Sequence, residues 1–303
     1  MRRLTRRTPS AVGGPPVPPH PLPPGRLVLV PDRGEFFVRD SAALADSGAA
    51  AEARRRPSVL LVHGWMFPSD LNWVNTYLPL VAAGYRVLAM DLRGHGRGLR
   101  AAQAFRLADC ADDAAAVLRA LDAGPARVVG YSMGGPVTQL LARRHPGAVA
   151  SFVLCATATD WSDPRQQLVW RTMGALRLVL GLFPRGAWTT GMRLAGAPAR
   201  GSDWVASELS RGSARDLAEA GRELGRFDSR PWIGELDAPR EVVLTTRDQL
   251  VPPPKQYALA RALGVAPVLL DAPHEACSTH PRQFVAALLG ALARLDARSR
   301  SAA

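Results

Sequence analysis

Ser132 lies at the centre of Gly-Tyr-Ser-Met-Gly (residues 130–134), a G-x-S-x-G pattern that can present a serine hydroxyl as a nucleophile. An apolar run over 126–129 precedes it and a helix is predicted over 136–144, so the serine is expected at a sharp strand-to-helix turn. The flanking glycines would permit the strained backbone angle of such a turn. The N–H of Met133, at the positive end of the helix dipole, would then favour negative charge nearby.

An ordinary glycine-rich turn is the alternative explanation, because the chain has 27 glycines. A serine hydroxyl is a poor nucleophile near neutral pH unless a neighbouring base, here a histidine, takes its proton. A carboxylate would hold that histidine in the correct tautomer and stabilise the imidazolium. The chemistry therefore requires a histidine and an acidic residue near Ser132, and their positions depend on the surrounding elements.

The composition limits the class of protein. With 303 residues, 47% of them hydrophobic, the chain can bury a substantial core as one large domain or one domain with an insertion. No apolar run approaches the roughly eighteen residues of a membrane span. The net charge of +12 comes from scattered arginines, with Lys255 the single lysine, so no nucleic-acid partner is expected.

Three cysteines are too few and too widely spaced for a disulfide framework or a zinc site. Cys110, Cys155 and Cys277 are therefore expected to be buried thiols in a reducing compartment, which indicates a cytoplasmic protein. No metal and no cofactor is expected. His63 and His95 have no other ligand-type residue close in sequence, so they are interpreted as histidines that brace loops.

Residues 1–25 form a basic, proline-rich segment that is expected to be a disordered tail. Arginines at positions 2, 3, 6 and 7 would fit a twin-arginine export signal, but no apolar segment follows them. The cluster could make a weak contact with an anionic membrane surface, although such clusters are more often simply solvated.

From residue 26 to 158, strand-like and helix-like segments alternate. Continuous apolar runs are typical of parallel strands buried on both faces. Strands are predicted at 26–30, 36–39, 58–62, 85–90, 126–129 and 151–154, the first two as a hairpin around the turn at 31–34. Helices are predicted at 73–83, 107–121 and 136–144. This alternation predicts an α/β fold with a mostly parallel, doubly wound sheet.

Residues 159–237 interrupt the alternation with five of the seven tryptophans and no convincing strand. Helices are predicted there at 167–182 and 214–224. The alternation then returns, with strands predicted at 240–245 and 267–270 and helices at 252–263 and 281–295. A helical segment inserted between two strands is expected to cap the strand ends, where open α/β sheets bind ligands. The alternative is that these helices pad the sheet elsewhere.

Four segments resemble motifs of the α/β-hydrolase fold family, in its serine-nucleophile branch of esterases and lipases with a helical cap. They are the oxyanion-loop motif 62–65, the D-x-R-G-x-G loop 91–96, the nucleophile elbow 130–134 and the acid-bearing loop 246–252. The resemblance covers residues 26–295. It implies a hydrolase core over 26–158 and 238–297 and a helical cap over 159–237.

The resemblance also implies the partners of Ser132, in the chain order Ser, Asp, His. His274, in the loop after the strand at 267–270, would be the base, and His280 is the rival. Asp248 would be the acid that orients the base, and Asp160 is the rival, since some members take the acid from the loop after the sixth strand.

By the same resemblance, the oxyanion hole consists of the backbone N–H groups of Trp65 and Met133. The predicted function is that of a carboxylesterase acting through an acyl-enzyme on Ser132. A serine at this position excludes the epoxide hydrolase and haloalkane dehalogenase branches, whose nucleophile is a carboxylate.

The substrate is expected to be a small acyl compound with a hydrophobic group, bound by Met66, Phe67, Tyr131 and Trp161. A lactonase, a thioesterase, a carbon–carbon bond hydrolase or a cofactor-free perhydrolase would use the same triad. A non-catalytic binding module of the same fold is the alternative from a different class.

Overall fold

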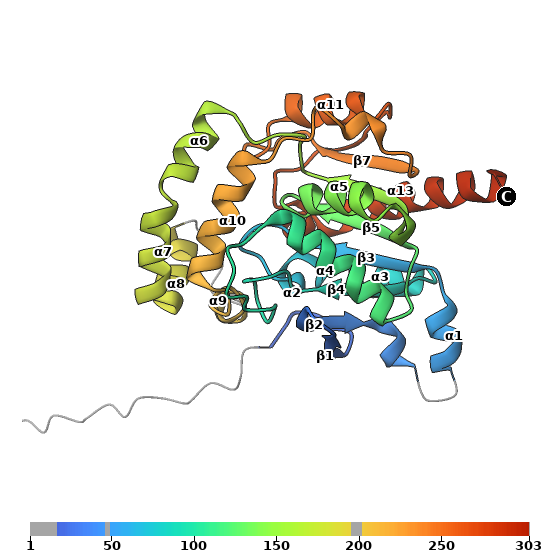
Figure 1. Cartoon of the computed structure of the whole chain (residues 1–303), viewed down its shortest axis with the longest axis horizontal. Coiled ribbons are helices and arrows are strands. Elements are labelled where there is room, and N and C mark those ends of the chain that lie inside the picture. Colours follow the sequence, from blue (N-terminus) through green and yellow to red (C-terminus); the bar gives the residue numbers. More distant parts are fainter. Residues whose placement is uncertain (1–16, 46–48, 195–201, 303) are drawn as a thin grey trace, which may run out of the picture.

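The computed structural model describes residues 17–45, 49–194 and 202–302, and in these a single eight-stranded sheet organises the chain (Figure 1). The strand order is β1-β2-β4-β3-β5-β6-β7-β8, and all pairs are parallel except β1–β2 and β2–β4. The strands are β1 (Gly25–Val30), β2 (Gly34–Asp40), β3 (Ser58–Val62), β4 (Arg86–Met90), β5 (Ala126–Tyr131), β6 (Val149–Cys155), β7 (Arg240–Thr245) and β8 (Val268–Leu270). The mostly parallel sheet and the edge hairpin are as predicted.

Helices cover both faces of this sheet, as a doubly wound fold requires. On one face the alternate strand residues pack with α4 (Leu107–Ala120), α5 (Gly134–Arg144) and α11 (Pro253–Ala262). On the other face they pack with α2 (Ser69–Trp73), α3 (Tyr77–Ala82), α12 (Ala276–Thr279) and α13 (Pro281–Ala302). The central strands β3 and β4 are buried at every position, which explains their continuous apolar sequences.

The helix predicted over 73–83 is wrong, because the structure contains two short helices, α2 and α3, in this region. Pro79 has no N–H, and its ring would clash with the carbonyl of residue 75 in a continuous helix. The chain therefore turns at 74–76, and the freed Asn75 side chain donates to the carbonyl of Cys277. The predicted helix 167–182 is likewise divided at Thr172, where α6 ends and α7 begins.

Among the described residues, five α-helices and a short 3-10 helix (Ile233–Glu235) lie between β6 and β7, in the segment where no strand was predicted. The α-helices are α6 (Pro164–Arg171), α7 (Met173–Leu182), α8 (Pro184–Leu194), α9 (Ser202–Leu209) and α10 (Ala214–Arg226). Figure 1 shows them together at one end of the sheet. The sequence analysis found neither α8 nor α9, nor the short α1 (Ala50–Arg55) that precedes β3. We refer to residues 159–237 as the helical insertion.

Three further predictions concern the N-terminal segment, the cysteines and membrane-spanning helices. The prediction of a disordered tail lies mostly outside the described residues, and β1 begins at Gly25. All three cysteines are buried free thiols, as expected. Over the described ranges, no helix combines the length and the apolar character that crossing a bilayer demands.

Candidate active site

Ser132 occupies a tight turn between β5 and α5, with a backbone φ of +53° that non-glycine residues rarely adopt. Besides a hydrogen bond from the N–H of Gly135 within the turn, two hydrogen bonds join the serine backbone to residues in and after β6. Its N–H donates to the carbonyl of Cys155 at 3.0 Å, and its carbonyl accepts from the Thr157 hydroxyl at 2.8 Å. The strained angle is thus fixed by the neighbouring strand β6, and the side chain is lifted out of the end of the sheet.

The glycines of the G-x-S-x-G pattern are required by close backbone approach. A Cβ on Gly130 would lie 2.4 Å from the carbonyl oxygen of Gly134 and from the hydroxyl of Thr138. A Cβ on Gly134 would lie 2.1 Å from the carbonyl oxygen of Val62. Both distances are far below van der Waals contact, so the first turn of α5 can pack against β3 and β5 only with glycine at these positions.

The structure brings Ser132, His274 and Asp248 together from the ends of β5, β8 and β7. The imidazole Nε2 of His274 lies 3.0 Å from Oγ of Ser132, and its Nδ1 lies 2.8 Å from Oδ2 of Asp248. All three side chains are largely shielded from solvent: Ser132 is 8% and Asp248 3% exposed as residues, and the His274 side chain is 12% exposed. This is the geometry in which a base can take a proton from serine while an acid orients the base.

Asp248 is held by hydrogen bonds to both of its carboxylate oxygens. Oδ1 accepts from the backbone N–H groups of Leu250 and Val251 at 2.9 and 2.8 Å. Oδ2 accepts from Thr245 at 2.8 Å and from Gln256 at 3.1 Å, besides its contact with the imidazole. The carboxylate therefore has a fixed orientation and only donors around it.

The two rival residues lie elsewhere. Asp160, at the start of the helical insertion, pairs with Lys255 at 3.0 Å. His280, between α12 and α13, is hydrogen-bonded to the hydroxyl of Thr279 at 2.9 Å. Neither side chain has a contact with Ser132 in the described chain.

Tyr131, which precedes the serine, holds the loop of the histidine. Its hydroxyl donates to the backbone carbonyl of His274. Burial raises the pKa of the Tyr131 phenol well above its usual value, so the group stays protonated and remains a donor. The aromatic rings of Tyr131 and His274 also meet edge to face, with centroids 5.9 Å apart.

The two backbone N–H groups predicted to form an oxyanion hole belong to Met133, which follows Ser132 in the chain, and to Trp65, in the loop after β3. Met133 precedes the first residue of α5, and in the described chain neither N–H donates to a protein acceptor. The loop after β3 is fixed beside them, because the N–H of Gly64 donates to Oδ1 of Asn72 at 2.8 Å and a Cβ on Gly64 would lie 3.3 Å from Cβ of Ser132. Unpaired donors next to a nucleophile are suited to stabilise a developing oxyanion.

His63 and His95 join the two loops beside the site, as loop-bracing residues would. His63 accepts from the N–H of Leu92 through Nε2 at 2.9 Å, and its Nδ1 donates to the carbonyl of Gly64 at 2.8 Å. Burial lowers the pKa of His63 to about 4 and that of His95 to about 3, so both imidazoles are neutral at pH 7. The two rings pack with centroids 5.1 Å apart.

A cavity of about 310 Å³ lies above Ser132 and His274, between the strand ends and the helical insertion. Apolar and aromatic side chains dominate its wall. The four residues predicted to contact substrate all line it: Met66, Phe67, Tyr131 and Trp161. Met66, the residue after Trp65, has a positive backbone φ of +66°.

The sequence analysis missed several wall residues from the insertion, among them Val169, Trp170, Trp188 and Leu224. Trp170 packs edge to face on Trp65, with ring centroids 5.3 Å apart, and so brings α6 onto the loop after β3. The abundance of tryptophan between β6 and β7 was a signal for these residues. It could not show which rings face the cavity and which fill the core.

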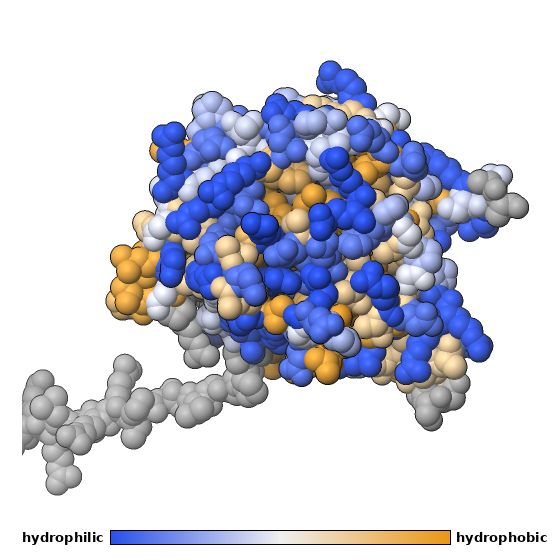
Figure 2. Space-filling view, in the orientation of Figure 1, coloured by the Kyte–Doolittle hydropathy of each residue, from blue (hydrophilic) through white to orange (hydrophobic). Residues whose placement is uncertain are grey.

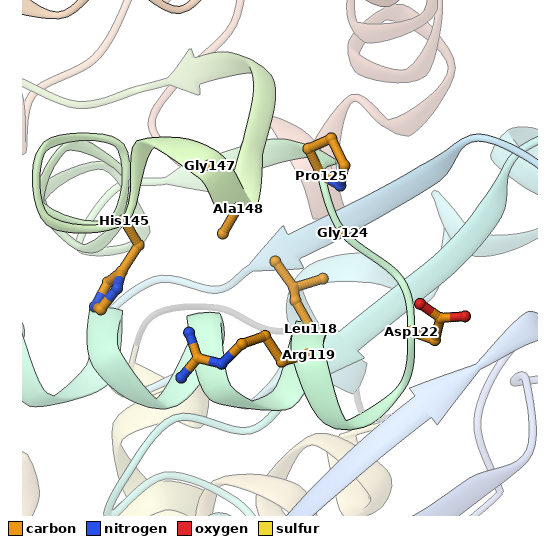
Figure 3. Close-up of a pocket in the computed structure, with 8 residues that line it drawn as sticks. All are labelled: Leu118, Arg119, Asp122, Gly124, Pro125, His145, Gly147 and Ala148. Atoms are coloured by element: carbon orange, nitrogen blue, oxygen red, sulfur yellow. The ribbon is translucent and has the colours of Figure 1, made fainter.

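A second and more open hollow of about 450 Å³ lies far from this chemistry (Figure 3). It is formed at the C-terminal end of α4 and in the loops that lead into β5 and β6, at the rim of the sheet opposite to Ser132. Its histidine, His145, is hydrogen-bonded to Asp112 at 2.7 Å. Although this hollow is larger, it combines no nucleophile with a base, so the candidate active site is the cavity at Ser132.

Comparisons with known proteins identify the family of this chain. A family model described as alpha/beta hydrolase fold matches residues 57–218. Pimeloyl-[acyl-carrier protein] methyl ester esterase from Methylococcus capsulatus is 34% identical over 250 residues, which span 75% of this chain and 91% of that protein. Non-heme chloroperoxidase from Streptomyces lividans is 41% identical over 97 residues, but these span only 32% of this chain and 35% of that protein.

Solved structures extend the similarity to nearly the whole chain. A thermophilic esterase from Thermogutta terrifontis superposes with a TM-score of 0.71 at 21% identity, covering 90% of this chain and 99% of that one. Identity this low carries information on the fold alone. The family model covers more than half of the sequence, and the methyl ester esterase aligns over three quarters of it. This chain therefore belongs to the alpha/beta hydrolase fold family.

Proposed function

We propose that this protein is a serine hydrolase that cleaves a carboxylic ester through an acyl-enzyme on Ser132. The observation that carries the proposal is the imidazole of His274, which lies 3.0 Å from the serine hydroxyl and 2.8 Å from the Asp248 carboxylate at the floor of an apolar cavity. The related methyl ester esterase supports an ester as the substrate class.

In the proposed reaction, Nε2 of His274 takes the proton of Ser132 as Oγ attacks the ester carbonyl carbon. The negative charge passes to the carbonyl oxygen, which accepts from the N–H groups of Trp65 and Met133, each donor worth about 3 kcal/mol. The imidazolium returns its proton to the leaving alkoxide, which departs as the alcohol. Water, deprotonated by the same imidazole, then attacks the acyl-enzyme and releases the acid.

The cavity sets the proposed substrate class. Its wall of Met66, Phe67, Tyr131 and Trp161, with further tryptophans from the insertion, favours a hydrophobic acyl or alkyl group. We assign residues 159–237 the role of a cap over the 26–158 and 238–297 core, because α6 and α10 supply the wall opposite the serine. A cytoplasmic location stays a prediction that agrees with three buried free thiols.

A cofactor-free perhydrolase is the second candidate, because the related chloroperoxidase matches 97 residues of this chain. In that reaction peroxide, in place of water, would attack the acyl-enzyme. A lactonase, a thioesterase or a carbon–carbon bond hydrolase would keep the same serine and base, and a non-catalytic binding module would have no use for the strained serine.

The test is covalent labelling with a fluorophosphonate probe, followed by mass mapping of the adduct. We expect labelling of Ser132 in the native protein and none in Ser132→Ala. p-Nitrophenyl esters of graded chain length, lactones, thioesters and acetate with peroxide would then separate the candidate reactions. A native, folded protein that forms no adduct on Ser132 would remove the enzymatic proposal as a whole.

A further inference from the structure

The outer side of the helical insertion exposes large apolar side chains on two consecutive helices. Leu178, Leu182 and Phe183 are 62%, 62% and 65% exposed at α7 and its end, and Leu168 on α6 is 66% exposed. Figure 2 shows hydrophobic residues gathered on this edge of the molecule, where α7 lies in Figure 1. Soluble chains rarely expose so many large apolar residues together unless the surface binds something.

Helix α7 is apolar on its inner side as well. Met173 and Leu180 are buried, and the sulfur of Met173 packs so closely on α10 that a Cβ on Gly221 would lie 2.5 Å from it. The inner residues alone account for the packing of α7 on the protein. The exposed leucines and Phe183 are therefore not needed for this contact, and a second environment must favour them.

The ionisable side chains of the segment that forms α6, α7 and α8 are all basic. The sequence from 164 to 194 contains five arginines and no aspartate or glutamate. Arg171 and Arg177 are exposed at the end of α6 and in the middle of α7. The acid on α10 that faces Arg177, Glu219, is already hydrogen-bonded to Arg215 and to the N–H of Phe105. The surface thus offers cations interspersed with apolar groups, which complements an anionic, apolar partner.

Helix α6 connects this surface with the cavity at Ser132. Val169 on α6 lines the cavity and is 47% exposed, and Leu250, which also lines it, is 57% exposed. The side chain of Gln166 donates to the carbonyl of Leu250 at 2.7 Å, which fixes the two sides of this rim together. A partner on the outer side of α6 would lie next to the mouth of the cavity.

We propose that this surface docks the protein on an anionic lipid bilayer. The docking face consists of Leu168, Arg171, Arg177, Leu178, Val179, Leu182 and Phe183. The apolar side chains enter the boundary of the acyl chains, and the arginines pair with headgroup phosphates. A second copy of the chain fits less well, because a symmetric contact would bring two all-positive segments against each other.

The test is co-sedimentation of the full chain with phosphatidylcholine vesicles, with and without phosphatidylserine. We expect binding to the anionic vesicles that weakens as salt is added. L178Q/L182Q should reduce the partition coefficient by about tenfold or more, and R171Q/R177Q by about fivefold for each arginine removed. L27Q/L29Q is the matched control, because these two leucines of β1 are 61% and 68% exposed far from the docking face.

The proposal is overturned if the docking-face variants bind as tightly as the control, or if the native chain ignores the lipid charge. It is also overturned if sedimentation velocity shows a dimer that L178Q/L182Q dissociates, since a second copy would then cover the face. Loss of binding only in R2Q/R3Q/R6Q/R7Q would assign the contact to the N-terminal arginines instead. Vesicle binding requires no turnover, so these results are independent of the proposed esterase activity.

Discussion

Replacement of Asp248 by asparagine tests whether this carboxylate sets the tautomer of His274, the proposed base. Oδ1 of Asp248 accepts two backbone N–H groups, from Leu250 and Val251 at 2.9 and 2.8 Å. An asparagine there must keep its carbonyl oxygen toward these donors, which turns its NH₂ group toward Nδ1 of His274. The imidazole would then have to accept at Nδ1 and carry its proton on Nε2, so Nε2 could no longer take the proton of Ser132.

The expected loss follows from this wrong tautomer. In serine hydrolases with the same constellation, the corresponding change lowers the rate by about 10⁴-fold with the geometry intact. That factor corresponds to about 5 kcal/mol of activation free energy. The fold is expected to survive, because the asparagine keeps the volume and the bonds to both backbone N–H groups.

The assay is the hydrolysis of a p-nitrophenyl ester, measured as kcat/KM for the native protein, Asp248→Asn and Asp160→Asn. Asp160→Asn is the matched control, because it removes the rival acid from an ion pair with Lys255 that lies outside the triad. We expect it to retain activity within about threefold. Urea unfolding of each variant separates a catalytic loss from a folding defect.

Two results would refute this assignment. An Asp248→Asn protein that keeps a tenth or more of the native kcat/KM would show that the carboxylate does not set the tautomer. A loss in Asp160→Asn as large as that in Asp248→Asn would move the acid to the loop after β6.

Three other predictions concern stability and specificity. Gly134→Ala should lower the free energy of unfolding by about 3 kcal/mol, because its Cβ would lie 2.1 Å from the carbonyl oxygen of Val62; an unchanged urea midpoint would contradict the packing. Burial lowers the pKa of His63 from 6.5 to about 4, so the unfolded chain binds more protons in this window. The free energy of unfolding should therefore fall as the pH drops through it, by up to about 3 kcal/mol, and His63→Gln should show a shallower slope in urea titrations. Trp170→Ala removes a ring that lines the cavity and packs on Trp65, so the kcat/KM maximum should move to longer acyl chains; an unchanged chain-length profile would exclude the ring from the pocket.

The strands could be predicted from the sequence because their environment is uniform. β3 and β7 have the predicted bounds, and β4 begins one residue later than predicted. A strand buried on both faces is mostly apolar, and such a run has few competing interpretations. The buried charges Arg86 in β4 and Glu241 in β7 are held in ion pairs with Asp40 and Arg294. The glycines around Ser132 could also be interpreted from the sequence, because Gly130 and Gly134 each lie against backbone atoms that leave no room for a Cβ.

The sequence showed where the insertion lies, but it did not show the bounds of all its helices or which side chains line the cavity. Helices α6 and α9 have only eight residues each, too few to establish a helical period, whereas the 13-residue α10 is strongly amphipathic and was predicted almost in full. The break between α2 and α3 depends on one proline, Pro79, whose effect reaches back to residue 75. The wall of the cavity depends on which of several tryptophans turn inward, and tertiary packing alone decides this.

Asp160 lies at the root of the helical insertion, next to the point where the chain leaves it. Residues 160 and 228 form an antiparallel bridge, and the N–H of Ser229 donates to the carbonyl of Thr159 at 2.8 Å, so the chain enters and leaves the insertion side by side. Burial alone would raise the pKa of Asp160, but hydrogen bonds from Ser162 and Lys255 lower it to about 2. The Asp160 carboxylate thus fastens the insertion to α11 through Lys255.

Among the described residues, the Asp160 side chain accepts from Thr159, Ser162 and Lys255 and has no hydrogen bond with a histidine. Asp248 has the complementary surroundings, with two backbone donors on one oxygen and a second oxygen that remains in reach of Nδ1 of His274. We therefore expect changes at the proposed docking face to alter vesicle binding without altering the distances between Ser132, His274 and Asp248.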